Sequence, residues 1–64
     1  MDKKKDAEII QAYILHCAQK RMTLAKMGRA IGRTKGWASA IVNGRTKRLM
    51  FSTRNRILEY LGEL

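Results

Sequence analysis

The sequence has no proline, one cysteine and five acidic residues among its 64 residues. A single cysteine excludes an intramolecular disulfide and a zinc site built from several cysteines, and it suits a reducing cytoplasm. No apolar stretch approaches the ~20 residues of a membrane-spanning helix, and the charged start Met1–Lys5 does not resemble a signal peptide. We therefore expect a cytoplasmic protein that has no membrane partner.

Motifs that carry catalysis or hold a cofactor are also missing from the sequence. It contains no phosphate-binding glycine loop, no nucleophile elbow and no metal-binding triad, and its one histidine, His16, has no partner at a suitable spacing. A chain of 64 residues also has little room to enclose a ligand pocket. We expect no enzymatic activity, no cofactor or metal, and no small-molecule ligand.

Positive charge is abundant, and its distribution is uneven. Lysine and arginine number 14, which gives a formal net charge of +9. The acids lie near the two termini, and the stretch from Lys20 to Arg56 contains 11 bases and no acid. A fold this small must expose these bases, so one surface is strongly positive. The expected partner is a polyanion, with nucleic acid favoured over an anionic membrane.

Apolar residues recur at helical spacing in four segments, which predicts an all-α fold of four short helices, with a fifth left open. The expected ranges are 6–20, 23–31 and 34–43, with a last helix that is capped by Ser52 or Thr53. Asp6, Thr23 and Thr34 are the expected N-caps of the first three. Residues 1–5 read as a flexible basic N-terminus, and residues 6–64 read as a single domain.

The expected core follows from the same spacing. The first helix supplies apolar residues at one face, each later helix supplies a shorter stripe, and methionines fill the gaps. The core residues predicted in this way are Ile10, Tyr13, Ile14, Cys17, Ala18, Met22, Leu24, Met27, Gly28, Ile31, Ala38, Ile41, Val42, Met50, Ile57, Leu58 and Leu61. Tyr60, Leu61 and Leu64 form either a C-terminal dimer contact or further packing on the first helix.

The second and third segments are joined by Gly32 and Arg33 alone. This link is too short to lay two helices antiparallel, so it predicts the steep crossing of a helix-turn-helix. Gly28 removes a side chain where the two helices come closest. In such a unit the second helix enters the major groove of DNA, and its first residues meet base edges.

The outward face of the second of these helices is formed by Lys35, Gly36, Ser39 and Ala40. Small side chains allow close approach to a surface, lysine can donate to guanine, and an alanine methyl can pack on thymine. Phosphate contacts are expected from hydroxyl, amide and basic side chains around this face and in the loop that follows it. These backbone-contacting residues are Thr23, Arg33, Thr34, Trp37, Asn43, Arg45, Lys47 and Arg48. For Trp37, packing at the rim of the core is the competing interpretation.

The stretch from Thr23 to Gly44, with the basic loop after it, resembles the helix-turn-helix of the Xre family of lambdoid phage repressors and Cro proteins. The resemblance covers about residues 9 to 62. It implies a lambda-repressor-like domain that regulates transcription in a phage or a bacterium and binds a two-fold symmetric operator in double-stranded DNA as a homodimer. By position, it assigns Lys35, Gly36, Ser39 and Ala40 to bases, and Thr23, Asn43 and the loop bases to phosphates.

The sequence departs from the family pattern at several positions. Leu24 stands where the family usually has a phosphate-contacting glutamine. Cys17 and Val42 stand where many members bury an Arg–Glu pair, and two packed apolar residues can replace such a pair at little cost. The chain also ends where many members begin a fifth helix, which leaves the dimer contact open.

Other function classes remain as alternatives. The same scaffold can serve as a protein-interaction module, such as a toxin-neutralising antitoxin. A membrane-active basic peptide would be unfolded in buffer, whereas the caps and glycine turns here specify a compact fold. Single-stranded RNA binding would need a stacking platform, and the chain has only four aromatic residues, Tyr13, Trp37, Phe51 and Tyr60.

Overall fold

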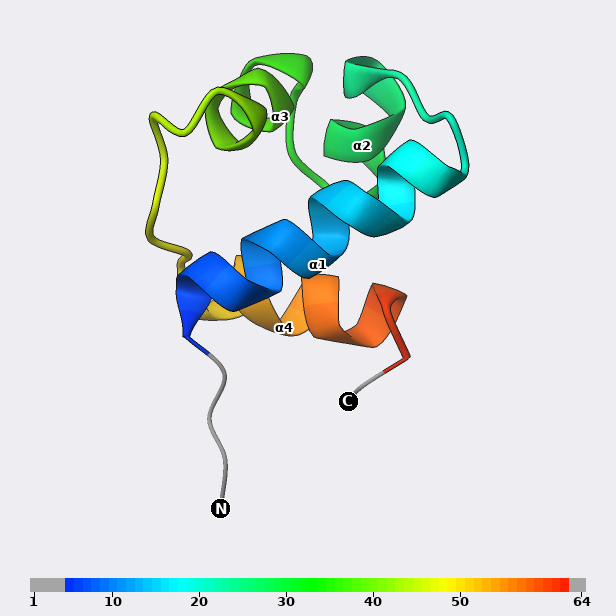
Figure 1. The fold of residues 1–64 in the computed structure, drawn as a ribbon. Coiled ribbons are helices and arrows are strands. Elements are labelled where there is room, and N and C mark those ends of the chain that lie inside the picture. Colours follow the sequence, from blue (N-terminus) through cyan, green and yellow to red (C-terminus); the bar gives the residue numbers. More distant parts are fainter. Residues whose placement is uncertain (1–4, 63–64) are drawn as a thin grey trace.

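The computed structural model describes residues 5–62 as four α-helices without a strand, which confirms the predicted all-α class. The helices are α1 (Asp6–Gln19), α2 (Leu24–Ala30), α3 (Lys35–Val42) and α4 (Phe51–Tyr60). The long α1 crosses the middle of the molecule, with α2 and α3 on one side and α4 on the other (Figure 1). No helix within the described range is long and apolar enough to cross a membrane.

The starts of the helices follow the predicted caps in two cases out of four. The Thr23 hydroxyl accepts from the Lys26 backbone N–H at 3.2 Å, and the Thr34 hydroxyl accepts from the Trp37 N–H at 3.2 Å. The prediction that Asp6 caps α1 is wrong, because Lys5 is the N-cap and its backbone N–H donates to the Glu8 carboxylate at 2.9 Å. Lys5, the last residue of the range that was read as a flexible N-terminus, is thus the N-cap of α1.

The start of α4 also differs from the prediction. Met50 is the N-cap, without a side-chain hydrogen bond, and the helix begins at Phe51. Neither Ser52 nor Thr53 caps it, since Thr53 lies in the first turn and is buried. The remaining expectations at the chain ends, for residues 1–4 and for Leu64, lie outside the described residues.

The first three helices end in the same way, which keeps the turns short. In each helix, the backbone N–H of the residue two positions after the C-cap donates to the carbonyl of the residue three positions before the C-cap, as in a Schellman motif. These donor–acceptor pairs are Met22 to Cys17 at 3.0 Å, Arg33 to Gly28 at 2.7 Å and Arg45 to Ala40 at 2.9 Å. The left-handed position is taken by Gly32 and Gly44, and after α1 by Arg21 at φ 54°.

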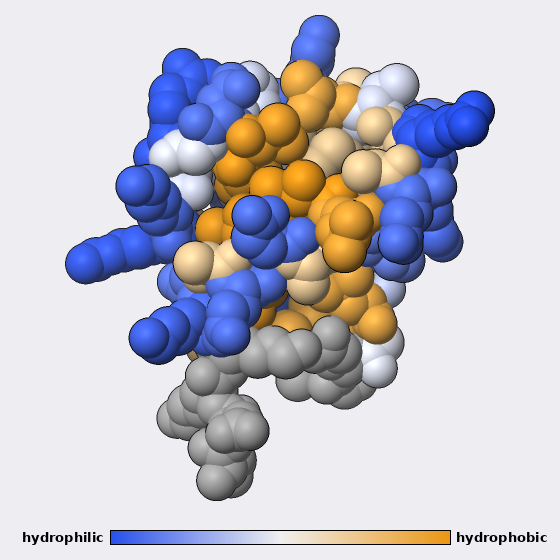
Figure 2. Space-filling view, in the orientation of Figure 1, coloured by the Kyte–Doolittle hydropathy of each residue, from blue (hydrophilic) through white to orange (hydrophobic). Residues whose placement is uncertain are grey.

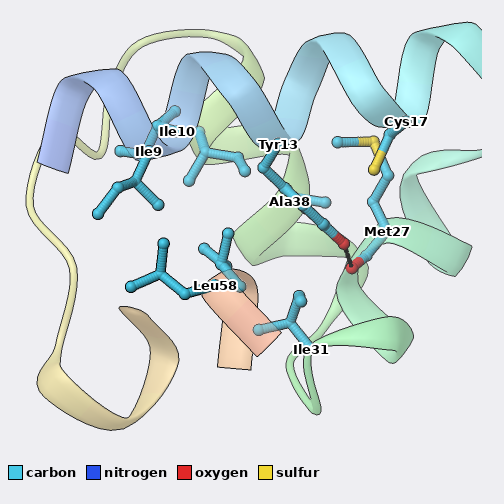
Figure 3. Packing of buried hydrophobic residues seen from close by; sticks show 10 residues of the cluster. Ile9, Ile10, Tyr13, Cys17, Met27, Ile31, Ala38 and Leu58 are labelled. Carbon is cyan, nitrogen blue, oxygen red and sulfur yellow. Dashed lines mark hydrogen bonds between the residues drawn. The ribbon is translucent and has the colours of Figure 1, made fainter. Parts of the chain in front are cut away.

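The core gathers on the inner face of α1 and receives side chains from the other three helices (Figure 3). Tyr13 lies at its centre, fully buried, and its hydroxyl donates to the Met27 carbonyl at 2.6 Å. Burial raises the pKa of the Tyr13 phenol and of the Cys17 thiol, so both groups are uncharged at neutral pH. Ile9 joins this core although its position was not singled out in the sequence.

Several predicted core residues lie elsewhere. Val42 is 45% exposed and Met50 is 64% exposed, and Ala18 is exposed as well. Val42 is the last residue of α3 and faces an open groove beside α1, so it does not pack with the buried Cys17. The expected replacement of a buried ion pair by an apolar pair is therefore wrong at Val42. Met50 caps α4 on the surface instead of filling the core.

Candidate nucleic-acid interface

The turn between α2 and α3 depends on a close backbone contact at Gly28. A Cβ atom built on Gly28 would lie 2.2 Å from the Thr34 carbonyl oxygen and 2.5 Å from its carbon. The Gly28 carbonyl also accepts the Arg33 N–H across the same turn. Backbone therefore packs on backbone here, as predicted, and α2, the turn and α3 form a helix-turn-helix (Figure 1).

The predicted base-reading residues share the outer side of α3. Lys35 and Gly36 are exposed, while Ser39 and Ala40 are half-buried. Asn43, about one turn beyond Ser39, extends the same face. Its side-chain amide donates to the Ser39 hydroxyl at 3.2 Å. The only long cationic side chain on this face is that of Lys35, so the rest of the face presents small groups close to the helix backbone.

The predicted phosphate-contacting hydroxyls lie at the starts of α2 and α3. Thr23 and Thr34 are both exposed, and each uses its hydroxyl oxygen to accept a cap hydrogen bond. A hydroxyl that accepts in this way keeps its own hydrogen for donation to an outside acceptor such as a phosphate. Arg33 is exposed in the turn between them. These three residues therefore remain candidates for contacts with the DNA backbone.

Trp37 sits at the boundary between this face and the core. Its side chain is half-buried and packs against the core cluster, with its ring centre 6.2 Å from that of Tyr13. This geometry supports the rim-packing interpretation of Trp37. A contact between Trp37 and a phosphate stays a prediction.

The basic loop, defined as Arg45–Arg48, is tied down at both ends. At its start the Arg45 and Thr46 N–H groups both donate to the Ala40 carbonyl of α3, at 2.9 and 3.2 Å. Just past its end the Leu49 N–H donates to the Asp6 carboxylate at 2.9 Å. Arg45, Lys47 and Arg48 are exposed between these two anchors. The loop thus starts beside the outer face of α3 with Arg45 and carries Lys47 and Arg48 toward the start of α1.

Asp6 is the residue of this site that the sequence reasoning missed. Its second carboxylate oxygen lies 3.8 Å from the Arg54 Nε, so Asp6 joins the start of α1 to the end of the loop and to α4. Leu49 lies 43 residues further along the chain, and no local pattern links two such distant positions. The unusual isolation of the few acids in a basic chain was the only available signal.

We expect Asp6→Ala to loosen the loop while leaving the four helices in place. Loss of a charge-assisted hydrogen bond costs about 1–2 kcal/mol at a partly buried site. Amide hydrogen exchange of Leu49 should therefore become roughly tenfold faster or more, with the Gly32 amide as an internal reference. Asp6→Asn keeps an acceptor oxygen and should restore most of the protection. Unchanged Leu49 exchange in Asp6→Ala would show that the carboxylate does not hold the loop.

The remaining polar side chains of residues 5–62 give no sign of a metal site. Within the described range no three His, Cys, Asp or Glu residues are placed to hold a metal ion. The His16 ring packs edge-on against Tyr60, with ring centres 5.1 Å apart.

The fold thus defines a small all-α domain with a helix-turn-helix and a basic loop. The chain matches no known family model, curated protein or solved structure.

Proposed function

We propose that this protein is a sequence-specific regulator of transcription that binds double-stranded DNA, with α3 in the major groove and the basic loop on the phosphate backbone. The observation that carries the proposal is the attachment of the loop to α3. The Ala40 carbonyl, on the helix face of small residues, accepts from the first two residues of the loop, so the exposed Arg45 stands beside that face and the exposed Lys47 and Arg48 follow it in the same short loop. A face of this kind suits close approach to a polyanion.

The roles of the residues follow from their chemistry. Lys35 donates to the acceptor atoms of guanine, and the Ala40 methyl packs on a thymine methyl. Gly36 and Ser39 let the helix backbone come near the base edges. Thr23, Arg33, Thr34 and Asn43, with the loop bases, contact phosphates and set the position of α3 in the groove.

The regulator acts by occlusion in this proposal. Two copies bind a palindromic operator with their α3 helices in successive major grooves, about 34 Å apart on one face of the duplex. The bound homodimer excludes polymerase or another regulator from the promoter. In this proposal the protein works in the cytoplasm of a bacterium, on the chromosome or on phage DNA. The proposal includes no catalytic step and no cofactor.

The first test is a titration of the protein onto DNA from its own upstream region and onto random duplex of equal length. Specific binding at least ~10³-fold tighter than binding to random DNA is expected for an operator. The titration is repeated at two salt concentrations, because phosphate contacts make affinity fall steeply with salt. Equal affinity for both duplexes would leave a charged surface without sequence recognition.

Two single substitutions separate base reading from backbone binding. We expect Lys35→Ala to lower affinity for the operator by about 1–3 kcal/mol and to leave affinity for random DNA nearly unchanged. Lys47→Ala should weaken binding to both duplexes by a similar factor and lower the salt dependence. Each affinity is measured by fluorescence anisotropy with labelled DNA. Identical effects of the two substitutions on both duplexes would refute the assignment of α3 as the recognition helix.

A further inference from the structure

An open groove of about 480 Å³ lies beside the proposed DNA interface. It runs between the first half of α1, the end of α3 and the start of the basic loop. The residues that shape it are Ala7, Ile10, Ile14, Val42, Thr46 and Lys47. The last two also belong to the basic loop, so the groove and the proposed DNA-binding surface share a wall.

The floor of the groove is largely apolar, with Gln11 as its polar residue on α1; Ala7 is exposed and Ile14 half-buried, whereas Ile10 is 6% exposed. Ala7, Ile10 and Ile14 form one stripe along α1, about 10 Å long at the rise of an α-helix. Val42 faces them from α3 and is 45% exposed, although its helix position favours a core residue. Apolar surface gathers on this side of the molecule and is bordered by hydrophilic side chains (Figure 2). A stripe of this length matches about two turns of a second helix.

The charge around the groove is positive. Lys47 stands on its rim, Arg45 and Arg48 flank Lys47 in the loop, and no acidic residue lines the groove. The nearby acids of α1 are engaged within the fold, Asp6 with the Leu49 N–H and Glu8 with the Lys5 N–H. A ligand that complements this surface therefore combines apolar side chains with negative charge.

We propose that the groove binds an acidic amphipathic helix of a partner protein, and that this binding displaces DNA from the basic loop. Such a helix offers apolar residues at i, i+3, i+4 and i+7 to the stripe on α1 and carboxylates to Lys47 and its neighbours. A second copy of the chain is a poor occupant, since it would bring another basic loop against the first. The displacement, but not the docking, rests on the proposed function.

The docking is tested with a synthetic 16-residue helical peptide that carries leucines at this spacing and glutamates on both flanks. The control peptide has the same composition, with its leucines spread around the helix, so both peptides carry the same charge. We expect the first peptide to bind roughly tenfold tighter or more, and to shift the amide resonances of Ile10, Ile14 and Val42. Equal affinity of the two peptides, or no shift at the groove, would overturn the proposal.

Variants on the protein side separate apolar docking from charge attraction. Val42→Lys adds a positive charge, so weaker binding of the acidic peptide can only come from the lost apolar contact. Leu15→Lys makes the same change at an apolar α1 residue that is 61% exposed and does not line the groove. We expect Val42→Lys to weaken peptide binding roughly tenfold and Leu15→Lys to weaken it less than about twofold. Equal loss in both variants would contradict the groove.

Two further measurements complete the test. Val42→Ser, a milder change, gives the same comparison if Val42→Lys lowers the helix content seen by circular dichroism. Self-association of the unliganded chain that Val42→Ser abolishes would assign the groove to a second copy and overturn the proposal.

With labelled DNA present, the leucine-striped peptide should release the duplex and the control peptide should not. If the chain binds no DNA, the proposed function fails, while the peptide results still decide the docking.

Discussion

Gly28→Ala is expected to remove a large share of the protein's free energy of unfolding. The added Cβ would lie 2.2 Å from the Thr34 carbonyl oxygen, and both the clashing atom and Gly28 itself belong to backbone that cannot turn away. Separating α2 from α3 to relieve this overlap costs at least ~3 kcal/mol. A domain of this size has a total free energy of unfolding of about 3–10 kcal/mol, so the loss is a large share of it.

The measurement is urea denaturation followed by the fluorescence of Trp37 and by circular dichroism. At the slope of about 1 kcal/mol per M typical of a small domain, the midpoint should fall by roughly 3 M. Gly36→Ala is the matched control, because its Cβ would meet only the Thr34 hydroxyl, at 3.7 Å. Within a helix this control should raise stability by about 0.5 kcal/mol. A Gly28→Ala protein whose urea midpoint equals that of the parent would mean that α2 and α3 do not approach as closely as described.

Neutralising the basic loop is expected to have the largest effect on DNA binding. In the triple variant Arg45→Gln, Lys47→Gln and Arg48→Gln, up to three phosphate contacts are lost. The slope of log affinity against log salt concentration should then fall by about 2.7, which corresponds to a ~10²–10³-fold loss of affinity near 0.1 M salt. The loss should be the same for operator and random DNA, because phosphates carry no sequence information.

Titrations at four salt concentrations measure this slope for each variant. The charge-conserving double variant Arg45→Lys and Arg48→Lys is the control and should keep the slope of the parent protein. Its affinity is compared directly with that of the triple variant, since the anchors at Ala40 and Asp6 involve none of the substituted side chains. A triple variant whose slope equals that of the parent would place the loop away from the DNA.

The helix-turn-helix is the part of the candidate site that the sequence predicted best. Its signals are local: Thr23 and Thr34 cap helices within three residues, and Gly32 ends a helix by its own backbone conformation. Gly28 was also recognised, since two helices joined by so short a link must nearly touch there. The exposure of Lys35 and of the loop bases followed from the charge alone.

Predictions were weaker where a residue has two plausible environments. Val42 continues the apolar stripe of α3, yet α3 ends there and leaves it beside an open groove. Met50 has the chemistry of a core residue, but it lies at a helix start on the surface, and Phe51 beside it is 76% exposed. Periodicity identifies the apolar side of a helix, whereas the neighbouring elements decide how much of that side is covered.

By itself the sequence determined the four helices, the sharp stops after α2 and α3, and a positively charged middle that lacks acids. These properties arise from interactions within about one helical turn and from composition. Only the tertiary structure decided that Asp6 holds the end of the basic loop, that Met50 rather than Ser52 or Thr53 precedes α4, and that a groove opens beside the loop. Each of these depends on how segments far apart in the chain pack together, and that geometry leaves no signal in a local pattern.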